Sequence, residues 1–370
     1  MNRRRYLGAT AGVVAGFAGC LDALDGPGDG SDGGDGGEEG PSVAVGDQRV
    51  VADTVATGLE VPWGVAYRDG VLHLTERPGR VVRIADGGRE VVADLADSTA
   101  AEGEGGLLGL VFRSDDPDAA VAYQTYDDGG LKNRILALDA ADGWSFESLF
   151  DGIPGAFVHD GGRLLVRDGS LYATTGDATD EAAAQDPEVL NGKVLRLTHA
   201  GEPHPDNPFG NAVFTYGHRN PQGLAVLDGA LYSTEHGPDT DDEINRLEAG
   251  GNYGWPAVMG PSDSPEFVDP LASYTPTIAP GGATVYPDDG PIEAWRGDLL
   301  FGTLAGQHLH RARIRGGEVV GNERLFEGTF GRLRTTFVGT DGHLHVVTSN
   351  RDGRGDPREG DDRVLRLRPA

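Results

Sequence analysis

The chain has a single cysteine, Cys20, among 370 residues, which excludes an intrachain disulfide. Lysine is nearly as rare, since only Lys132 and Lys193 occur. With 31 basic against 59 acidic residues, the formal net charge is −28. A surface this acidic repels nucleic acid and anionic membranes, so a nucleic-acid partner is excluded. The composition is typical of a protein adapted to very high salt, and arginines that cluster within it indicate an anionic partner.

A long apolar run is also missing. The apolar stretch 7–18 is too short to cross a membrane as a helix of about twenty residues. It follows a basic segment, 2–5, with a twin-arginine character, and it overlaps segment 17–20, which resembles a lipoprotein cleavage box. We therefore predict that residues 1–20 are a Tat-type lipoprotein signal peptide and that Cys20 is lipid-anchored on the outer face of the cytoplasmic membrane. The alternative is an uncleaved anchor with a buried Cys20.

The next segment, 21–42, consists mostly of Gly, Asp, Glu and Pro. Such a segment buries too little apolar surface to fold, so it is predicted to be a disordered acidic tether. The folded domain is then expected to span residues 43–370.

Helical periodicity is absent from this domain, and short β-branched runs separated by turns take its place. An Asp-Gly turn followed by a short strand recurs at 69–75, 168–174, 228–234 and 341–348, with weaker copies at 118–126 and 298–304. A second strand follows each copy, at 80–84, 134–138, 193–197, 243–247, 309–314 and 363–367. Six phased copies predict an all-β, six-bladed β-propeller closed by an N-terminal strand, for which residues 49–56 are the candidate. A two-sheet sandwich does not explain the six-fold count.

Polar side chains gather in segments 217–223, 235–239 and 241–245, which contain a guanidinium, side-chain amides, imidazoles and several carboxylates. Arginine and amides bind carboxylates through charge-assisted hydrogen bonds. Carbonyl and carboxylate oxygens are the ligands of Ca²⁺. The mixture predicts a small anionic ligand held together with a hard cation. The alternative is a Gly/Pro-rich connection between strands, with Arg219 in an ordinary surface ion pair.

Three further features are candidates for the same site. His159 precedes the third repeat and Asp177 ends it, so one blade can bring a general base and its orienting carboxylate to one rim. An exposed turn histidine is the alternative. Arg332 and Arg334 alternate and would face one side of a strand, either toward an anion or in a structural salt-bridge pair. The Gly-rich segment 101–109 permits close backbone approach to a ligand, but it lacks the ending of a phosphate loop.

These residues resemble the soluble glucose/sorbosone dehydrogenases, which are PQQ-dependent aldose sugar dehydrogenases. The resemblance covers residues 59–367 and rests on segments 103–109 (GEGGLLG), 159–163 (HDGGR), 175–177 (TGD), 219–223 (RNPQG), 235–238 (EHGP), 242–245 (DEIN), 252–256 (NYGWP) and 332–334 (RLR). The fold of that family is a six-bladed propeller, which the repeat count reaches separately.

The resemblance implies pyrroloquinoline quinone (PQQ), a tricarboxylate, bound with Ca²⁺ on one face of the propeller. It implies oxidation of an aldose at C1 to an aldonolactone, with hydride passing to the quinone and electrons to an external acceptor. The implied catalytic residues are His159 as base, Asp177 and Arg219. The implied cofactor contacts are Glu104, Asn220, Gln222, His236, Arg332 and Arg334. The implied calcium ligands are the carbonyls of Gly237 and Pro238, with Glu243 and Tyr253 at a second, structural site.

The chain departs from the family pattern at Ala305, where many members have a lysine that faces the quinone carboxylates. Segment 348–355 also differs, and its Arg351 and Arg354 are candidate substitutes for that lysine. Two other functions therefore remain open. One is a propeller without quinone that binds sugars or glycans at the cell surface. The other is a calcium-dependent lactonase, although this chain offers mainly arginines and carbonyls where such enzymes use several carboxylate or amide ligands.

Overall fold

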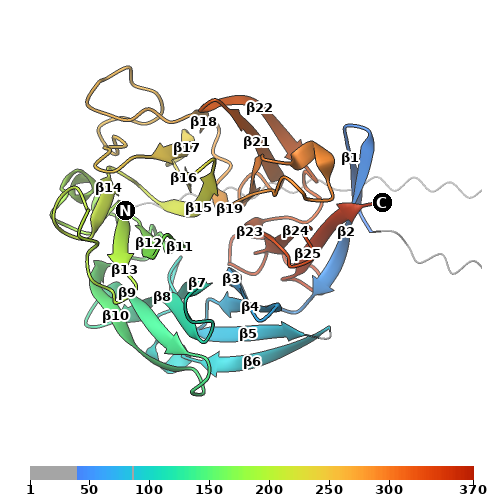
Figure 1. Ribbon diagram of the computed structural model, residues 1–370, viewed down its shortest axis with the longest axis horizontal. Helices are drawn as coiled ribbons and strands as arrows, with labels where there is room; N and C mark the ends of the chain where they lie inside the picture. Colours follow the sequence, from blue (N-terminus) through green and yellow to red (C-terminus); the bar gives the residue numbers. More distant parts are fainter. Residues whose placement is uncertain (1–39, 86) are drawn as a thin grey trace, which may run out of the picture. The chain divides into compact units, whose positions relative to one another are not determined.

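The computed structural model describes residues 40–85 and 87–370. The predicted signal peptide, and the predicted tether as far as residue 39, lie outside the described residues. The fold is all-β and propeller-like, with four four-stranded sheets and one nine-stranded sheet around a common centre (Figure 1). Within the described residues, no helix is both long enough and apolar enough to span a membrane.

The four smaller sheets are β3 (Pro62–Arg68), β4 (Val71–Glu76), β5 (Arg80–Ala85), β6 (Gly88–Asp94); β7 (Leu107–Phe112), β8 (Ala119–Asp127), β9 (Leu131–Asp139), β10 (Ser145–Pro154); β11 (Leu164–Arg167), β12 (Ser170–Thr175), β13 (Lys193–Thr198), β14 (Val213–Tyr216); and β15 (Pro221–Leu227), β16 (Ala230–Glu235), β17 (Asp242–Leu247), β18 (Ala272–Tyr274). The nine-stranded sheet has the order β1 (Ser42–Val45), β2 (Gln48–Ala56), β25 (Val364–Pro369), β24 (Leu344–Thr348), β23 (Leu333–Val338), β19 (Pro280–Val285), β20 (Leu299–Thr303), β21 (Leu309–Arg315), β22 (Glu318–Leu325). Three short 3-10 helices, Ala96–Ser98, Glu181–Gln185 and Glu293–Trp295, lie in connections.

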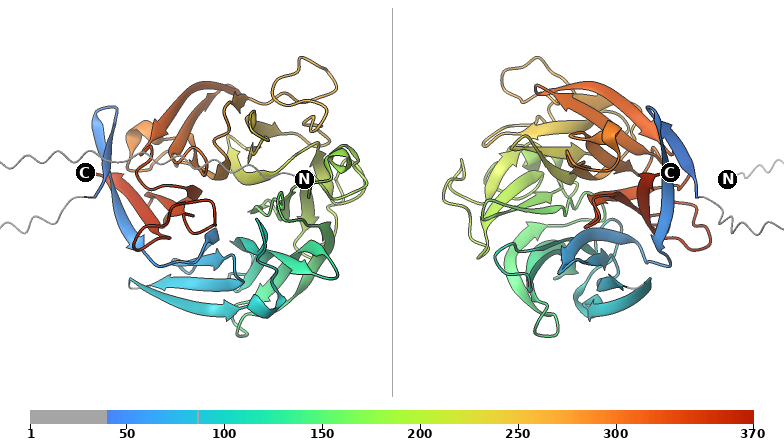
Figure 2. Two further views of the ribbon diagram at one scale, coloured as in Figure 1. Left: turned by 180° about the vertical axis from the view of Figure 1, so that it is seen from behind. Right: turned by 45° about the vertical axis from the view of Figure 1, so that its right-hand side comes forward.

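The strands predicted from the Asp-Gly repeats are confirmed. The six copies correspond to β4, β8, β12, β16, β20 and β24, and the strands that follow them correspond to β5, β9, β13, β17, β21 and β25. The predicted closing strand is also confirmed, because β2 pairs antiparallel with β25. The two strands lie together at the outer edge of the ring (Figures 1 and 2).

Neighbouring sheets approach each other closely at their inner strands. A Cβ atom at Gly109 would collide with the carbonyl oxygen of Gly162, and one at Gly64 would collide with that of Leu108. Only glycine therefore permits this backbone approach. The apolar faces of the sheets also pack together, as where Trp63, Leu108 and Leu164 from three sheets share one buried cluster. Apolar packing thus joins neighbouring sheets of the ring.

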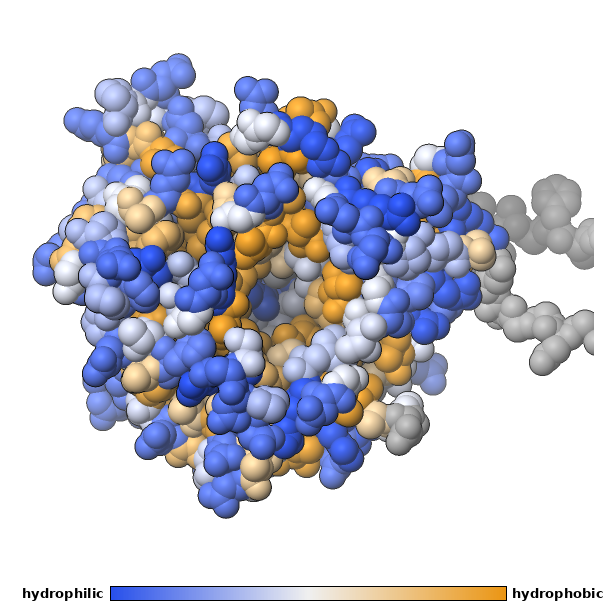
Figure 3. Space-filling model, viewed as in Figure 1, coloured by the Kyte–Doolittle hydropathy of each residue, from blue (hydrophilic) through white to orange (hydrophobic). Residues whose placement is uncertain are grey.

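Most of the predicted site residues lie in or beside loops at one end of the sheets. Because antiparallel strands alternate in direction, the loop that enters an inner strand lies at the same end as the loop between the second and third strands. Loops of these two kinds carry or adjoin Glu104, His159, Asp177, Arg219, Asn220, His236, Gly237, Pro238, Arg332 and Asp352. The face seen in Figure 3 is hollowed at its centre, where apolar residues surround hydrophilic ones that lie deeper.

Candidate active site

His159 and Asp177 are in contact. The His159 Nδ1 atom lies 2.8 Å from Oδ1 of Asp177. The Asp177 carboxylate is buried and also accepts hydrogen bonds from the indole Nε1 of Trp255 at 2.9 Å and from the backbone N of Thr179 at 2.8 Å. A carboxylate held in this way keeps the imidazole proton on Nδ1, which leaves Nε2 of the neutral ring as a proton acceptor. The His159 side chain is 17% exposed, so a ligand can reach it.

Glu104 joins three segments of the site. Its Oε2 accepts hydrogen bonds from the backbone N of His159 and from Nδ2 of Asn220, each at 3.1 Å, and its Oε1 lies 2.8 Å from Nη1 of Arg354. Burial opposes ionisation of Glu104, but His236 and the ion pair with Arg354 outweigh it and lower the pKa of Glu104 to about 2. His159 has a φ of 66°, which is uncommon for a residue other than glycine. The Glu104 carboxylate therefore helps to hold the strained backbone of His159.

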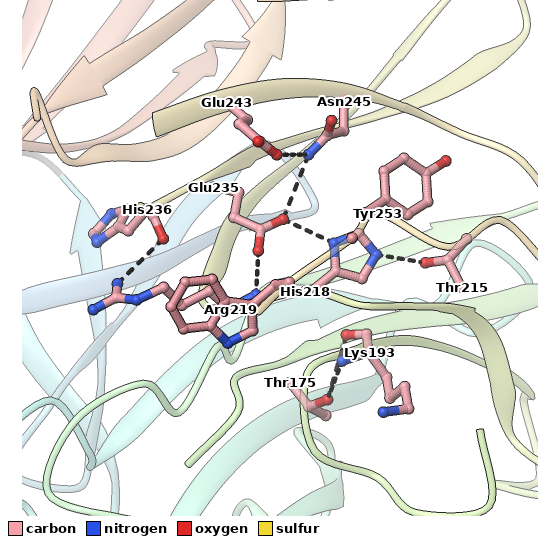
Figure 4. Close-up of polar contacts among 12 residues, drawn as sticks. Thr175, Lys193, Thr215, His218, Arg219, Glu235, His236, Glu243, Asn245 and Tyr253 are labelled. Atoms are coloured by element: carbon pink, nitrogen blue, oxygen red, sulfur yellow. Dashed lines mark hydrogen bonds and ion pairs between the residues drawn. The ribbon is translucent and has the colours of Figure 1, made fainter. Parts of the chain in front are cut away.

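The Arg219 guanidinium is held by main-chain carbonyls. Its Nη1 donates to the carbonyl oxygens of Gly237 at 2.8 Å and His236 at 3.2 Å. Figure 4 shows the contact with His236. It also lies over the Trp255 ring, 5.4 Å from the ring centroid. Its Nε is buried without a partner among the described residues. The Gly237 carbonyl, a predicted calcium ligand, thus already accepts one hydrogen bond.

Arg332 and Arg334 reach the same carboxylate, that of Asp352. Nη2 of Arg332 lies 2.8 Å from Oδ2 of Asp352, and Nη2 of Arg334 lies 3.8 Å from the same oxygen. The two guanidinium groups therefore share one side, as the alternation predicts. Arg334 also donates to Oε1 of Gln222 at 2.5 Å, and burial lowers the pKa of Arg334 to about 10. Ala305 adjoins this group, because Nη1 of Arg332 donates to the carbonyl oxygen of Leu304.

A buried network fixes the backbone that carries Arg219. The Glu235 carboxylate accepts hydrogen bonds from Nδ1 of His218 at 2.8 Å and from the backbone N of Arg219 (Figure 4). The His218 ring stacks on Tyr253, with the ring centroids 4.6 Å apart. Nε2 of His218 lies 2.9 Å from the Thr215 hydroxyl. These contacts make His218 a structural residue that positions its neighbour.

The predicted calcium ligands line one small pocket. Gly237, Pro238, Glu243 and Tyr253 lie around it together with Glu235. Burial, and then the charge of Glu235, raise the pKa of Glu243 to about 8, so a cation beside Glu243 would favour its ionised form. The Tyr253 hydroxyl donates to the Arg246 carbonyl at 2.6 Å and accepts from the backbone N of Glu248, so it is already satisfied.

The donors of this pocket fit Ca²⁺ by their chemistry, because carboxylate and carbonyl oxygens are what that ion prefers. Among the described residues, no three or more His, Cys, Asp or Glu side chains form a metal-binding group. A cation here would therefore need carbonyl oxygens as well as carboxylates.

The glycines of the 103–109 loop were predicted to permit close backbone approach to a ligand, and in the structure they permit close approach to other parts of the protein backbone. A Cβ atom at Gly103 would collide with the Phe157 carbonyl, and one at Gly106 would collide with that of Arg77. The close approach is to neighbouring protein backbone, which seats Glu104 beside His159.

Sequence reasoning missed three residues of the site: Trp255, Glu235 and Asp352. Trp255 and Glu235 lie within segments 252–256 and 235–238, which the sequence already singles out. Their place in these segments is the signal that could have identified them. Asp352 gives no such signal, because it lies in an irregular connection between β24 and β25 and meets Arg332 only through the fold.

Residues 59–358 match the family described as Glucose / Sorbosone dehydrogenase. The aldose sugar dehydrogenase YliI of Escherichia coli (strain K12) is 31% identical over 332 residues, which cover 80% of this chain and 89% of that protein. The PQQ-bound aldose sugar dehydrogenase of Streptomyces coelicolor has a TM-score of 0.78 and 36% identity, covering 87% of this chain and 98% of that one. An oxidoreductase from Thermus thermophilus, described provisionally as a glucose dehydrogenase, has a TM-score of 0.80 and 42% identity, covering 86% and 99%.

By fold and by identity, the chain groups with propeller-like proteins that are described as sugar dehydrogenases. It belongs to the glucose/sorbosone dehydrogenase family, because the family match extends over most of the ring.

Proposed function

We propose that this protein oxidises aldose sugars at C1 to aldonolactones, with PQQ and Ca²⁺ as cofactors and an external molecule as electron acceptor. The single observation that carries the proposal is the His159–Asp177 pair, with 2.8 Å between Nδ1 and Oδ1, in loops at the same end of the sheets as the loop that carries Arg219. The relatives are described as aldose sugar or glucose dehydrogenases, and one of them is PQQ-bound.

The residues present fit the quinone. Arg219 and Arg334 each have a buried Nε without a partner among the described residues. A buried donor left unsatisfied costs about 1–3 kcal/mol, so an anion that accepts from these groups is favoured. Arg219, Arg334, Asn220 and Gln222 would hold its carboxylates. When bound, the quinone would supply the acceptor for the hydride that leaves C1.

The protein's own part in the reaction is proton transfer and positioning. Nε2 of His159 takes the proton of the C1 hydroxyl, and Asp177 stabilises the imidazolium that forms. Trp255 holds the second carboxylate oxygen of Asp177, so the dyad keeps one geometry. The Gly237 and Pro238 carbonyls would hold one Ca²⁺, and Glu243 with main-chain oxygens would hold a second.

The test uses the purified full-length chain. PQQ and Ca²⁺ are added, and reduction of a dye is followed with a panel of aldoses while the quinone absorbance is recorded. We expect aldose-dependent dye reduction and a change in quinone absorbance on binding. Absence of both would contradict the proposal.

A second function is favoured by one observation. The Asp352 carboxylate already pairs with Arg332 and Arg334, the arginines that would bind an anionic cofactor. The Gly237 carbonyl, which would bind a cation, already accepts a hydrogen bond from Arg219. Together with Ala305, this supports a propeller that lacks quinone and binds sugars or glycans at the cell surface. Sugar binding without any change in quinone absorbance would distinguish it.

We also propose that the ring counts as six blades and that the protein works outside the cell. The count is supported by the nine-stranded sheet, in which the single parallel pair Gly282–Thr335 separates β19–β22 from a second four-stranded group formed by β23, β24, β25 and β2. Export with a lipid anchor at Cys20 is supported by segment 2–20 of the sequence, and adaptation to high salt by the net charge of −28.

A further inference from the structure

An open pocket of about 520 Å³ lies beside the proposed active site. Its lining combines cationic and apolar groups, among them Arg77, Arg351, Arg354, Asp352, Phe157 and Gly103. Three arginines thus line one opening in a protein whose net charge is −28. This excess of positive charge has no role in the chemistry described above.

The guanidinium groups of Arg354 and Arg351 have donors to spare. A guanidinium carries five N–H groups. Arg354 uses Nη1 for Glu104, and Arg351 uses Nε for the Asp361 carbonyl at 2.6 Å; no other side-chain hydrogen bond joins either guanidinium to a described residue. The Arg354 side chain is 55% exposed. Both can therefore bind an oxyanion in the pocket through charge-assisted hydrogen bonds.

The acidic lining residue does not cancel this charge. The Asp352 carboxylate is 3% exposed and is paired with Arg332, which itself lies outside the pocket lining. Arg77 faces the pocket while it donates to the Gly105 carbonyl at 2.9 Å. Glu104 offsets the charge of Arg354, but Arg77 and Arg351 leave the pocket with a net positive charge. That charge would concentrate an anionic substrate against the repulsion of the rest of the surface.

The pocket is joined to His159 through a single carboxylate. One oxygen of Glu104 accepts from the His159 backbone and the other pairs with Arg354, so His159 and Arg354 are both neighbours of this one side chain. Phe157 lies two residues before His159 and is 63% exposed, which is unusual for a large apolar side chain. Its ring offers an apolar wall for the carbon face of a sugar ring.

We propose that this pocket binds the anionic group of an acidic aldose, so that the substrate class is a sugar with a free C1 hydroxyl and a carboxylate or phosphate at the far end. The inference rests on the proposed function, whose reaction is unchanged. The C1–H bond breaks and its hydride passes to the quinone, the hydroxyl proton passes to His159, and C1 becomes the carbonyl of a lactone.

Binding is tested first, without quinone, by titration calorimetry of the full-length protein at fixed ionic strength. The probes are glucuronate, its neutral methyl ester, glucose 6-phosphate and glucose. We expect glucuronate or glucose 6-phosphate to bind about tenfold or more tightly than the ester and glucose, and the stronger of the two identifies the anion. Arg354→Gln and Arg351→Gln should each remove most of this preference.

The matched control is Arg358→Gln. Arg358 lies in the same connection between β24 and β25 and donates to the Thr329 carbonyl, but it is not part of the pocket lining. This variant should keep the preference for the anionic sugars.

The outcomes separate this proposal from the proposed function. Equal binding of the acid and its ester, or a preference that survives Arg354→Gln, would overturn the pocket assignment even where glucose supports dye reduction. Loss of PQQ binding in Arg354→Gln with an intact preference for anionic sugars would also overturn it and assign Arg354 to the cofactor. Charge-dependent binding in a protein that reduces no dye with any sugar would support the pocket and contradict the oxidation.

Discussion

The imidazole of His159 has one nitrogen committed to Asp177 and is partly exposed, so its loss can be tested separately from cofactor binding. His159→Asn removes the base but not the guanidinium groups that would hold the quinone. We expect turnover to fall by about 10²–10⁴-fold, with PQQ affinity little changed. Dye reduction and an absorbance titration with PQQ measure the two effects. His343→Asn, on a turn between β23 and β24, is the control, and an active His159→Asn variant would remove His159 from the reaction.

Asp160 should make stability depend on pH. Burial first, and then the charge of Glu104, raise the pKa of Asp160 to about 6, although the amide of Asn133 donates to one of its oxygens at 2.9 Å. Since an unfolded aspartate has a pKa of about 3.9, the folded state holds this proton more tightly. The resulting stability is fully present below about pH 4 and is lost as the pH rises through 6, by about 3 kcal/mol.

Asp160→Asn should remove this slope, because the amide cannot ionise. Urea unfolding at pH 4 and pH 7 measures it, and we expect the variant to gain stability relative to the parent protein at the higher pH. Identical pH dependence in the two proteins would show that Asp160 titrates normally.

At the scale of elements, closure of the ring depends on β2. Val50 is fully buried in a cluster with Leu344 and Leu367, while Thr54 lies exposed on the same strand. Val50→Asp places an unpaired charge in this core and should lower the free energy of unfolding by more than about 3 kcal/mol. Thr54→Asp should change it by about 0.5 kcal/mol or less. Denaturant unfolding measures the free energy of unfolding of the two variants. Equal losses in Val50→Asp and Thr54→Asp would contradict the claim that the buried face of β2 stabilises the closed ring.

The hairpin of β16 and β17 should respond to calcium. Glu235 and Glu243 are opposite each other in its register, and Gly237 and Pro238 lie in its loop. Ca²⁺ at 100 times its dissociation constant should stabilise the fold by about 2.7 kcal/mol. Glu243→Gln should remove the part of this gain that comes from the ion at Glu243, and Mg²⁺ should give less than Ca²⁺, because it demands a stricter octahedral geometry. Thermal unfolding with and without each ion provides the measurement; an undiminished gain in Glu243→Gln would show that Glu243 holds no ion.

The elements were more predictable than the contacts between them. The Asp-Gly turns and alternating strands are local signals, so β4, β12, β16 and β24 could be read directly from the chain. The pairing of His159 with Asp177 was also predictable, because one repeat lies between them. The pairing of Glu104 with Arg354 was not, since it joins residues 250 positions apart that meet only when the ring closes.

At the scale of the whole molecule, two electrostatic effects of opposite sign compete. Exposed ion pairs such as Arg83–Glu90 and Lys132–Asp128 weaken as salt is added, but each such pair contributes only about 0–1 kcal/mol. The net charge of −28 acts against the compact state through repulsion that extends over the whole surface. Raising KCl from 0.1 M to 1 M shortens the Debye length from about 10 Å to about 3 Å and screens that repulsion.

Repulsion should dominate, so we expect the midpoint of thermal unfolding to rise with KCl. A parallel series in sucrose is the control, because sucrose favours burial by exclusion from the surface without screening charge. If charge repulsion limits stability, KCl should still raise the midpoint of thermal unfolding when a high, fixed concentration of sucrose is present. A midpoint that falls with KCl would mean that the surface ion pairs outweigh the net charge, and the inference of salt adaptation from composition would then fail.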